Sequence, residues 1–262
     1  MDHEFVIPAY GRAPYLEDCI RSILAQDGGG ARILIGTSTA SPAIGNIAAK
    51  FGIPVRENPQ RRDIATDWNF AMTQSQAQFV TIAHQDDLYE PGYLRTMARL
   101  AGSHPGLTMA FSGYREHTDA GVRPLNVNLR IKAWLCARAF GRSEAIATVA
   151  AKRSLLSLGN PVCCPSVMLN RRRVPDFRFS SSLHTNLDWE AWMRLAGLDG
   201  EFVYTRDALL SKRVHRDSET TVTIATRVRQ AEDLQMFREF WPKPVASTIA
   251  AIYSFGYLAN RV

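Results

Sequence analysis

The hydrophobic positions of the first hundred residues alternate between the spacing of strands and the spacing of helices. Phe5–Ile7 form a short apolar run that stops at Pro8, and the apolar residues of Leu16–Leu24 then recur every three or four positions, as on one helix face. Phe79–Ala83 has the β-branched and aromatic content of a central strand. Repeated strand–helix–strand units imply a mainly parallel sheet. The same reasoning predicts further strands at Ile33–Ile35, Pro54–Arg56 and Thr108–Ser112, and further helices at Ala43–Phe51, Ile64–Ser75 and Pro91–Leu100.

The pattern is weaker in the second half of the chain. Residues 120–161 are basic and partly helical and contain no clear strand, which predicts an inserted subdomain. Ser166–Leu169 is expected to return to the sheet as a strand, and helices are expected at Asp188–Ala196 and Thr226–Trp241. Val245–Leu258 is shorter than the roughly 20 residues that span a bilayer. It is therefore interpreted as a helix that docks against the rest of the protein or as a segment that contacts a membrane surface.

Length and composition narrow the class of protein. The 262 residues suit one large α/β domain with an appended subdomain. With 46% hydrophobic and 21% charged residues, the chain can bury a sizeable core, which excludes disordered, collagen-like and coiled-coil classes.

The charge balance indicates an anionic ligand or surface. Lys and Arg number 31 against 25 Asp and Glu, a net charge of +6, and basic clusters occur at Arg61–Arg62, Arg171–Arg173 and Lys212–Arg213. Charge alone does not choose between nucleic acid, lipid and phosphate. Nucleic acid is not the expected partner, because the sequence has neither an aromatic–basic platform nor a helix-turn-helix signal.

The cysteines and the start of the chain predict a cytoplasmic protein. Cys19, Cys136, Cys163 and Cys164 form no CxxC pair, which disfavours zinc and a disulfide framework and favours a reducing compartment. Met1–Tyr10 lacks the charged and apolar regions of an export signal.

Unusual polar residues follow three of the predicted elements. Parallel sheets bind ligands beyond the carboxyl ends of their strands, and Pro8–Arg12 and Gln85–Asp87 both follow predicted strands, while Asp188 begins a late helix. Paired carboxylates at a strand end are costly unless a cation lies between them, and Mg²⁺ or Mn²⁺ on a diphosphate would satisfy that cost. The alternative is that Asp86 and Asp87 form a solvated turn capping the next helix. Both interpretations stay open on residue chemistry alone.

Four segments, in order, carry a resemblance to a known family. Phe5–Arg12, with the helix that follows, looks like the opening of the family 2 glycosyltransferases, and Ala83–Leu94 is similar to their D-x-D segment. Leu187–Leu195 resembles the E-D-W-x-x-W-x-R-L stretch that contains the catalytic base, and Arg213–His215 resembles the closing R-x-H segment. The resemblance spans roughly residues 4–221, and four motifs in the right order are more specific than any one.

The resemblance implies a GT-A fold, which is a Rossmann-like, mainly parallel sheet flanked by helices, with a helical acceptor-side insertion and C-terminal helices. Residues 1–115 would bind the nucleotide sugar and residues 116–262 the acceptor, within one continuous domain. It also implies a nucleotide-diphosphate-sugar donor, Mg²⁺ or Mn²⁺, and inversion at the anomeric carbon. The acceptor would be a sugar, a lipid-linked glycan or a small molecule, with peripheral membrane contact in the lipid case.

The resemblance also assigns roles to individual residues. Asp188 would be the general base. Asp86, Asp87 and His215 would hold the metal, and Arg213 and Arg216 the diphosphate. The nucleotide would be bound by Pro8, Ala9, Tyr10, Arg12, Thr37, Asn69, Gln85 and Asp86.

The chain departs from the family pattern at three places. Gly36–Ser38 stand where one or two Asp residues usually follow the second strand, so the nucleobase stays open. His84 replaces the first Asp of the D-x-D segment, and Trp68 stands where an Arg often precedes Asn69. These departures motivate an alternative function, a non-catalytic relative that binds a nucleotide sugar or a glycan.

Each assignment also has a structural alternative. Asp188 fits the N-cap of a helix, a role that Asp fills often. His215 alone is typical of a surface histidine, and Tyr10 fits core packing as well as stacking on a base. Trp189 and Trp192 are expected to pack in the core or line the acceptor wall.

Overall fold

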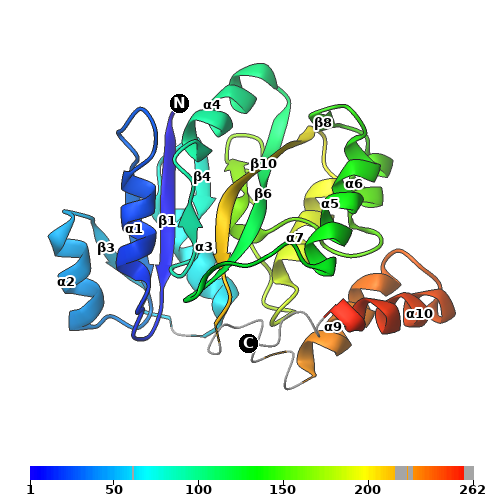
Figure 1. Ribbon diagram of the computed structural model, residues 1–262. Helices are drawn as coiled ribbons and strands as arrows, with labels where there is room; N and C mark the ends of the chain where they lie inside the picture. Colours follow the sequence, from blue (N-terminus) through cyan, green and yellow to red (C-terminus); the bar gives the residue numbers. More distant parts are fainter. Residues whose placement is uncertain (61, 216–222, 224–226, 257–262) are drawn as a thin grey trace.

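The computed structural model describes residues 1–60, 62–215, 223 and 227–256 and shows a mixed α/β protein. One central sheet is flanked by helices, as expected from the sequence (Figure 1). In the described part of the chain this sheet has ten strands, eight of which form the order β3-β2-β1-β4-β9-β6-β10-β5, with β7 beside β6 and β8 beside β10. The strands are β1 (His3–Ala9), β2 (Ile33–Thr37), β3 (Val55–Glu57), β4 (Phe79–Ile82), β5 (Leu88–Tyr89), β6 (Leu107–Thr118), β7 (Gly121–Val122), β8 (Ala145–Ile146), β9 (Met168–Asn170) and β10 (Glu201–Arg213).

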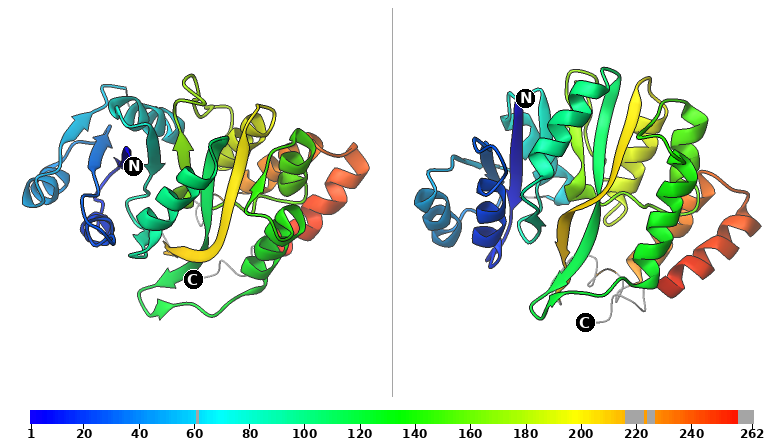
Figure 2. Two further views of the ribbon diagram at one scale, coloured as in Figure 1. Left: turned by 90° about the horizontal axis from the view of Figure 1, so that it is seen from above. Right: turned by 45° about the horizontal axis from the view of Figure 1, so that its top comes forward.

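Helices cover both faces of the sheet, because successive strand residues point to opposite faces. In β1, Phe5 and Ile7 belong to one buried cluster and Val6 to the other. The first cluster lies under α1 (Leu16–Leu24), α2 (Pro42–Lys50) and α4 (Tyr93–Ser103). The second lies under α3 (Ile64–Gln74), α5 (Val127–Phe140), α6 (Val149–Leu156), α7 (Leu187–Ala196), α9 (Val228–Arg238) and α10 (Lys243–Ser254). Figure 2 shows α1 and α2 at one end of the molecule and α10 at the other.

The direction of the strand order reverses between β1 and β4. The chain runs from β1 through β2 to β3 on one side of β1, then returns to place β4 on the other side, all in parallel. Right-handed connections therefore put α3 on the face opposite α1 and α2. The crevice beyond the ends of β1 and β4 is the position at which open α/β sheets bind ligands.

The predicted stop of the first strand at Pro8 is wrong, because β1 continues to Ala9. Proline is tolerated here because pairing with β4 ends at Val6, which lies opposite Ile82. The carbonyl of Val6 accepts a hydrogen bond from the amide of Ala83, so the backbone groups of Val6 point to the edge of β1 that pairs with β4. The backbone groups of Pro8, two residues further on, point to the same edge. The N–H that Pro8 lacks would have pointed to this edge, so the pairing with β4 stops here, while the pairing with β2 continues with Pro8 opposite Gly36 and Ala9 opposite Thr37.

A long strand is missing from the sequence prediction. The thirteen residues of β10 pair in parallel with β6, which itself runs beyond the predicted Thr108–Ser112. The pairing shifts register between Thr205 and Ala208, and the charged residues of this bulge interrupt the apolar pattern. Since β9 is antiparallel to both β4 and β6, the sheet is mainly rather than wholly parallel.

The rest of the second half follows the sequence prediction with shifted boundaries. Residues 120–161 hold α5 and α6 but also two short strands, β7 and β8, that were not predicted. Helix α9 is shorter than predicted, and Thr226 lies outside the described residues. Tyr253 of α10 contacts the rings of Trp189 and Phe237, with ring centroids 6.1 and 5.5 Å away, so α10 docks against the protein. None of the helices in the described residues is both long and apolar enough to cross a membrane.

Two glycines provide a matched test of the packing between β2 and α3. A Cβ on Gly36 would lie 2.9 Å from the Cβ and 3.1 Å from the Cα of Ala71, whereas a Cβ on Gly45 in α2 would meet nothing within 4 Å. Gly36→Ala should lower the free energy of unfolding by about 1–3 kcal/mol, because α3 must move. Gly45→Ala should raise it by up to about 1 kcal/mol through helix propensity. Urea unfolding measures both, and equal effects would contradict the described contact.

Candidate functional site

A cavity of about 620 Å³ lies beyond the carboxyl ends of β1 and β4. Its walls come from the loops after these strands, from the start of α3, from α5, from residues 160–165 and 181–188, from the end of β10 and from the start of α9. The cavity thus brings together residues from both halves of the sequence. Of the predicted site residues in the described chain, those that line it are Pro8, Tyr10, Gln85, Asp86, Asp87, Asp188, Arg213 and His215.

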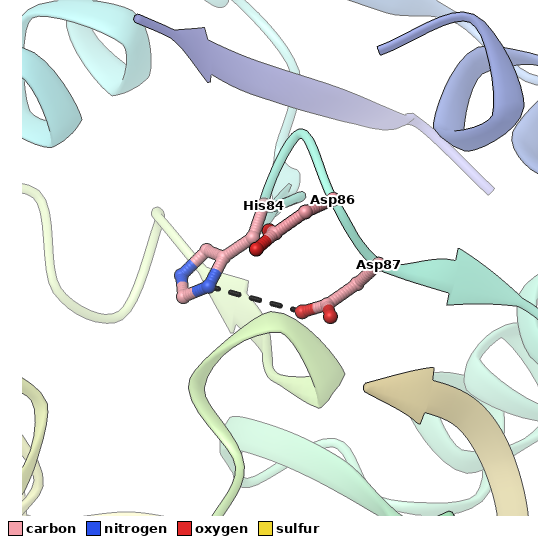
Figure 3. Close-up of side chains that lie close together, drawn as sticks. All are labelled: His84, Asp86 and Asp87. Carbon is pink, nitrogen blue, oxygen red and sulfur yellow. Dashed lines mark ion pairs between the residues drawn. The ribbon is translucent and has the colours of Figure 1, made fainter. Parts of the chain in front are cut away.

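The loop after β4 holds a cluster of possible metal ligands. Atoms of His84, Asp86 and Asp87 that could bind a metal all lie within 4.8 Å of one another. The Asp87 carboxylate is 1% exposed, and its Oδ1 accepts a 2.8 Å hydrogen bond from the amide of Arg213. Its Oδ2 lies 3.8 Å from Nδ1 of His84, and Figure 3 shows these two side chains pointing toward each other. The sequence analysis named His84 only as a departure, so this neighbour was missed.

The electrostatics of the cluster fit a divalent cation. Burial, together with the adjacent charge of Asp86, raises the pKa of Asp87 well above its ordinary value. Burial lowers the pKa of His84 to about 4, which leaves a neutral imidazole able to act as a ligand. Among the described residues, Asp87 Oδ2 and His84 Nε2 are buried without a hydrogen-bond partner. A cation between the carboxylates would satisfy such an oxygen and offset their repulsion.

The end of β10 fixes this loop from the opposite side. His215 Nε2 lies 3.0 Å from Asp86 Oδ2, so the structure brings these two predicted metal ligands together. Although burial raises the pKa of Asp86, the His215 hydrogen bond and the nearby histidine charges outweigh burial and lower it. Arg213 Nε donates to the Asp86 carbonyl at 3.1 Å, and its guanidinium lies 4.1 Å from the centre of the Tyr15 ring. The predicted residue Arg216 lies outside the described residues.

The loop after β1 is tied to the same segment. The amide of Tyr10 donates to Gln85 Oε1 at 2.8 Å, and Gln85 Nε2 donates back to the Tyr10 carbonyl at 3.1 Å. The side chain of Tyr10 is half exposed at the cavity, so the alternative of core packing for Tyr10 is wrong. The cavity wall thus has an accessible aromatic ring next to the acidic loop.

The other predicted nucleotide-binding residues do not line the cavity. Ala9 and Thr37 are buried, and Arg12 is exposed outside the lining. The side chain of Asn69 exchanges two 2.8 Å hydrogen bonds with the backbone of Phe179, so it holds that loop.

A carboxylate from α3 stands near the end of β2, where the sequence lacks the family's usual Asp. Asp67 lines the cavity and accepts hydrogen bonds from Ser38 Oγ at 2.7 Å and from Asn58 Nδ2 at 2.9 Å. No motif marks Asp67 in the sequence, because it lies among the apolar positions of the helical pattern of residues 64–75.

Asp188 lies in the wall formed by the second half of the chain. It is the second residue of α7, and Asn186 occupies the N-cap position, so the N-cap alternative for Asp188 is wrong. Asp188 Oδ2 accepts from Asn160 Nδ2 at 3.1 Å, and Oδ1 accepts from the amide of Trp189 at 2.7 Å. Burial raises the pKa of Asp188, against the opposing charge of Arg229, which favours proton uptake nearer to neutral pH.

Glu232 of α9 fixes the start of the Asp188 helix. Its buried carboxylate accepts from the backbone amides of His184, Thr185 and Asn186 at 2.6, 2.9 and 3.0 Å. Asp233 accepts from the Asn186 side chain at 2.7 Å. These carboxylates satisfy amides that precede α7 and have no partner within the helix. No motif marks Glu232 in the sequence, because its partners lie in a distant segment.

Three basic side chains complete the wall around Asp188. Lys132 of α5, Lys212 of β10 and Arg229 of α9 all line the cavity. The charges of all three act on Asp188. Lys212 was noted in the sequence only as part of a basic cluster, and Lys132 and Arg229 were not singled out.

Comparison with protein families and curated proteins gives two matches. The family model described as Glycosyl transferase family 2 matches residues 4–176. The chain is 27% identical over 228 residues to Uncharacterized protein MT1568 of Mycobacterium tuberculosis (strain CDC 1551 / Oshkosh), covering 84% of this chain and 70% of that protein.

Comparison with solved structures shows the same fold in glycosyltransferases. S. aureus TarS 1-349 in complex with UDP-GlcNAc has a TM-score of 0.67 at 13% identity, covering 99% of this chain and 73% of that one. The mannosyltransferase PcManGT from Pyrobaculum calidifontis, in complex with GDP-Man and Mn²⁺, has a TM-score of 0.67 at 16% identity, with coverage of 99% and 70%. Glucosyl-3-phosphoglycerate synthase from Mycobacterium tuberculosis, with Mn²⁺, UDP and glucosyl-3-phosphoglycerate, has a TM-score of 0.57 at 15% identity, with coverage of 89% and 79%. The predicted GT-A fold is confirmed.

Replacing Glu232 should show how much the start of α7 depends on its carboxylate. At pH 7, Glu232→Gln should lower the free energy of unfolding by about 1–3 kcal/mol, because backbone amides lose a charged acceptor. Although burial raises the pKa of Glu232, the bonds from the three amides outweigh burial and lower it below its ordinary 4.5. The stabilisation is therefore present above pH 4.5 and is lost as the pH falls through the folded-state pKa.

Denaturant unfolding between pH 7 and pH 3 measures this difference. The wild type and Glu232→Gln should converge in stability at the acid end. Glu239→Gln, an exposed change just after the same helix, serves as the control and should follow the wild type throughout. A constant gap between wild type and Glu232→Gln at every pH would contradict the assigned contact.

Proposed function

Because the chain belongs to glycosyl transferase family 2, and is a glycosyltransferase that takes a sugar from a nucleotide donor, we propose that it transfers this sugar to an acceptor hydroxyl with inversion. One observation carries the proposal. The same cavity is lined by the acidic loop after β4 and by Asp188. Residues 1–115 would thus supply the donor site and residues 116–262 the acceptor site and the base.

The acidic loop is proposed to hold Mg²⁺ or Mn²⁺ through Asp86 and Asp87, with His84 and His215 as the nitrogen ligands nearest to them. Oδ2 of Asp87 is buried and has no hydrogen-bond partner among the described residues, which supports this assignment. Two structures with the same fold, PcManGT and glucosyl-3-phosphoglycerate synthase, were solved with Mn²⁺. A bound divalent ion neutralises negative charge that develops on a leaving diphosphate.

The donor nucleotide is proposed to lie along the loop after β1. Pro8 and the half-exposed ring of Tyr10 line this part of the cavity, and an aromatic face can stack on any base. Asp67 and Ser38 offer polar groups where the family's usual Asp is missing. Arg213 and His215 hold the metal-binding loop in place through Asp86.

Asp188 is proposed as the general base. A carboxylate in the first turn of a helix can take the proton of an acceptor hydroxyl as that oxygen attacks the anomeric carbon. Attack from the side opposite the leaving diphosphate inverts the configuration at that carbon. Asn160 orients Oδ2, and Glu232 fixes the preceding loop, so both act on the base by positioning it.

Replacing the base tests this assignment directly. With UDP-, dTDP- and GDP-sugars and Mn²⁺, the wild type should turn over one donor, and Asp188→Asn should lose at least about 100-fold in the rate of transfer. Donor binding, measured by calorimetry, should be retained, because Asp188 acts on the acceptor. Glu190→Gln is the matched control, since this carboxylate is paired with Arg194 at 2.6 Å on the same helix. Equal transfer by wild type and Asp188→Asn would rule out Asp188 as the base.

The same substitution should not destabilise the fold. Because burial raises the pKa of Asp188, the wild type loses stability as the pH rises from 3.8 through the folded-state pKa. The melting temperature of Asp188→Asn relative to wild type should therefore increase over this range and then level off. A change of 1 kcal/mol corresponds to about 2–4 °C in a chain of this size. Calorimetric melting from pH 4 to pH 8 measures the trend, and the opposite trend would contradict the buried state of this carboxylate.

A further inference from the structure

We propose that the acceptor carries a phosphate group, and that Lys132 and Arg229 bind this phosphate beside the hydroxyl that receives the sugar. The inference rests on the proposed function, because it names the acceptor class of the same cavity. It begins from the distribution of charge over the cavity walls.

The two halves of the chain give the cavity walls of opposite charge. Among the described lining residues, the first half contributes four carboxylates and Arg62 as the only basic residue, which suits a site for a cation. Those carboxylates are Asp63, Asp67, Asp86 and Asp87. Among the lining residues that the structure describes in the second half, Asp188 is the only carboxylate. The lining lysines and arginines of this half are Lys132, Lys212, Arg213 and Arg229.

Arg213 is already neutralised, whereas the other three basic residues are not. Its guanidinium lies 3.3 Å from Asp18 and 3.5 Å from Asp119. Within the described chain, none of Lys132, Lys212 and Arg229 is within ion-pair distance of a carboxylate.

Lys132 and Arg229 keep hydrogen-bond donors that a ligand can use. Lys132 donates to the neutral hydroxyl of Tyr114 at 2.9 Å, which leaves two of its three N–H groups available. Arg229 feels the charges of Asp233 and Asp188 and bonds to the hydroxyl of Tyr253. Although burial lowers the pKa of Arg229, these neighbours outweigh burial and raise it, so the guanidinium stays charged and can bind an anionic ligand.

The carboxylates near Lys132, Lys212 and Arg229 indicate which of these cations lie on the sugar-donor side of the cavity and which on the acceptor side. Lys212 acts on both Asp87 and Asp188, which places it between the metal-binding loop and the base. Lys212 is among the strongest influences on the pKa of Asp87, whereas Lys132 and Arg229 are among the strongest influences on the pKa of Asp188. They are therefore assigned to the acceptor, while Lys212 lies where the transferred sugar and its diphosphate would meet. A phosphate monoester carries about −1.5 to −2 charges at pH 7, which matches the two positive charges of Lys132 and Arg229.

The test uses glycerol 3-phosphate as the probe and glycerol as its uncharged control. Calorimetry is performed on the whole chain saturated with Mn²⁺ and the nucleoside diphosphate found in the donor panel, so that the donor side is filled. The wild type should bind glycerol 3-phosphate and not glycerol. The double variant Lys132→Gln/Arg229→Gln should bind the phosphate at least about tenfold more weakly, because it loses two charged hydrogen-bond donors.

A matched variant separates this effect from a general loss of positive charge. Arg130→Gln/Arg238→Gln removes the same charge from exposed positions of the same helices, α5 and α9, and should bind like the wild type. Phosphatidylcholine vesicles that contain phosphatidic acid form a second arm. Binding to these vesicles but not to free glycerol 3-phosphate, lost in the Lys132→Gln/Arg229→Gln variant, would support the inference with a lipid as the source of the phosphate.

Two results would overturn the inference. One is that the wild type binds neither glycerol 3-phosphate nor the vesicles that contain phosphatidic acid. The other is that the Lys132→Gln/Arg229→Gln variant binds these two probes as the wild type does. Donor hydrolysis and melting temperature are measured on the same samples. If the double variant folds and hydrolyses the donor normally, the proposed function stands whatever the result of the phosphate binding. If the wild type binds no nucleotide-sugar donor, the proposed function itself is overturned.

Discussion

The hydrogen bond from the amide of Arg213 to the buried carboxylate of Asp87 joins the two parts of the sheet that make the site. Asp87 is almost fully buried, so its charge must be met by protein groups or by a cation. The bond ties the loop after β4 to the end of β10, although the two are far apart in the sequence. It thereby fixes Asp86 beside His215 and places Lys212 between the acidic loop and Asp188. Together with the pairing of β5 and β10, this contact holds the acidic loop next to the wall that carries Asp188.

Electrostatic asymmetry across the cavity then explains how two chemically different partners can be bound next to each other. The wall from the first half is acidic and fits a cation carrying a diphosphate. The wall from the second half, in the residues that the structure describes, is basic around a single carboxylate. The positive charges around Asp188 keep its carboxylate ionised more readily than burial alone would allow, and burial still raises its pKa. Asp188 is thus balanced between two opposing influences, which suits the base role proposed for it.

The sequence predicted the elements of the first hundred residues because their apolar spacing is regular and their strands are separated by helices of ordinary length. It failed where tertiary contacts override local pattern. One case is Pro8, whose strand continues because its other edge stays paired with β2, and another is β10, where a bulge breaks the alternation. The motifs led to the acidic loop and to Asp188. They did not lead to Asp67 or Glu232, because each takes its place in the site through hydrogen bonds to other segments. Such long-range pairing has no periodic signature in a single sequence.

The hydrogen bonds that Glu232 accepts from the backbone before α7 have a consequence for the order in which the parts of the protein fold. Every strand described in the sheet is complete by Arg213, whereas the helix that carries Glu232 begins only at Val228. In a chain leaving the ribosome, the sheet can therefore form before the segment ahead of α7 has its carboxylate partner. The part of the site proposed for the donor would then form before Asp188, the proposed base, is held in position. A nascent chain would therefore be able to bind its donor before it could transfer the sugar.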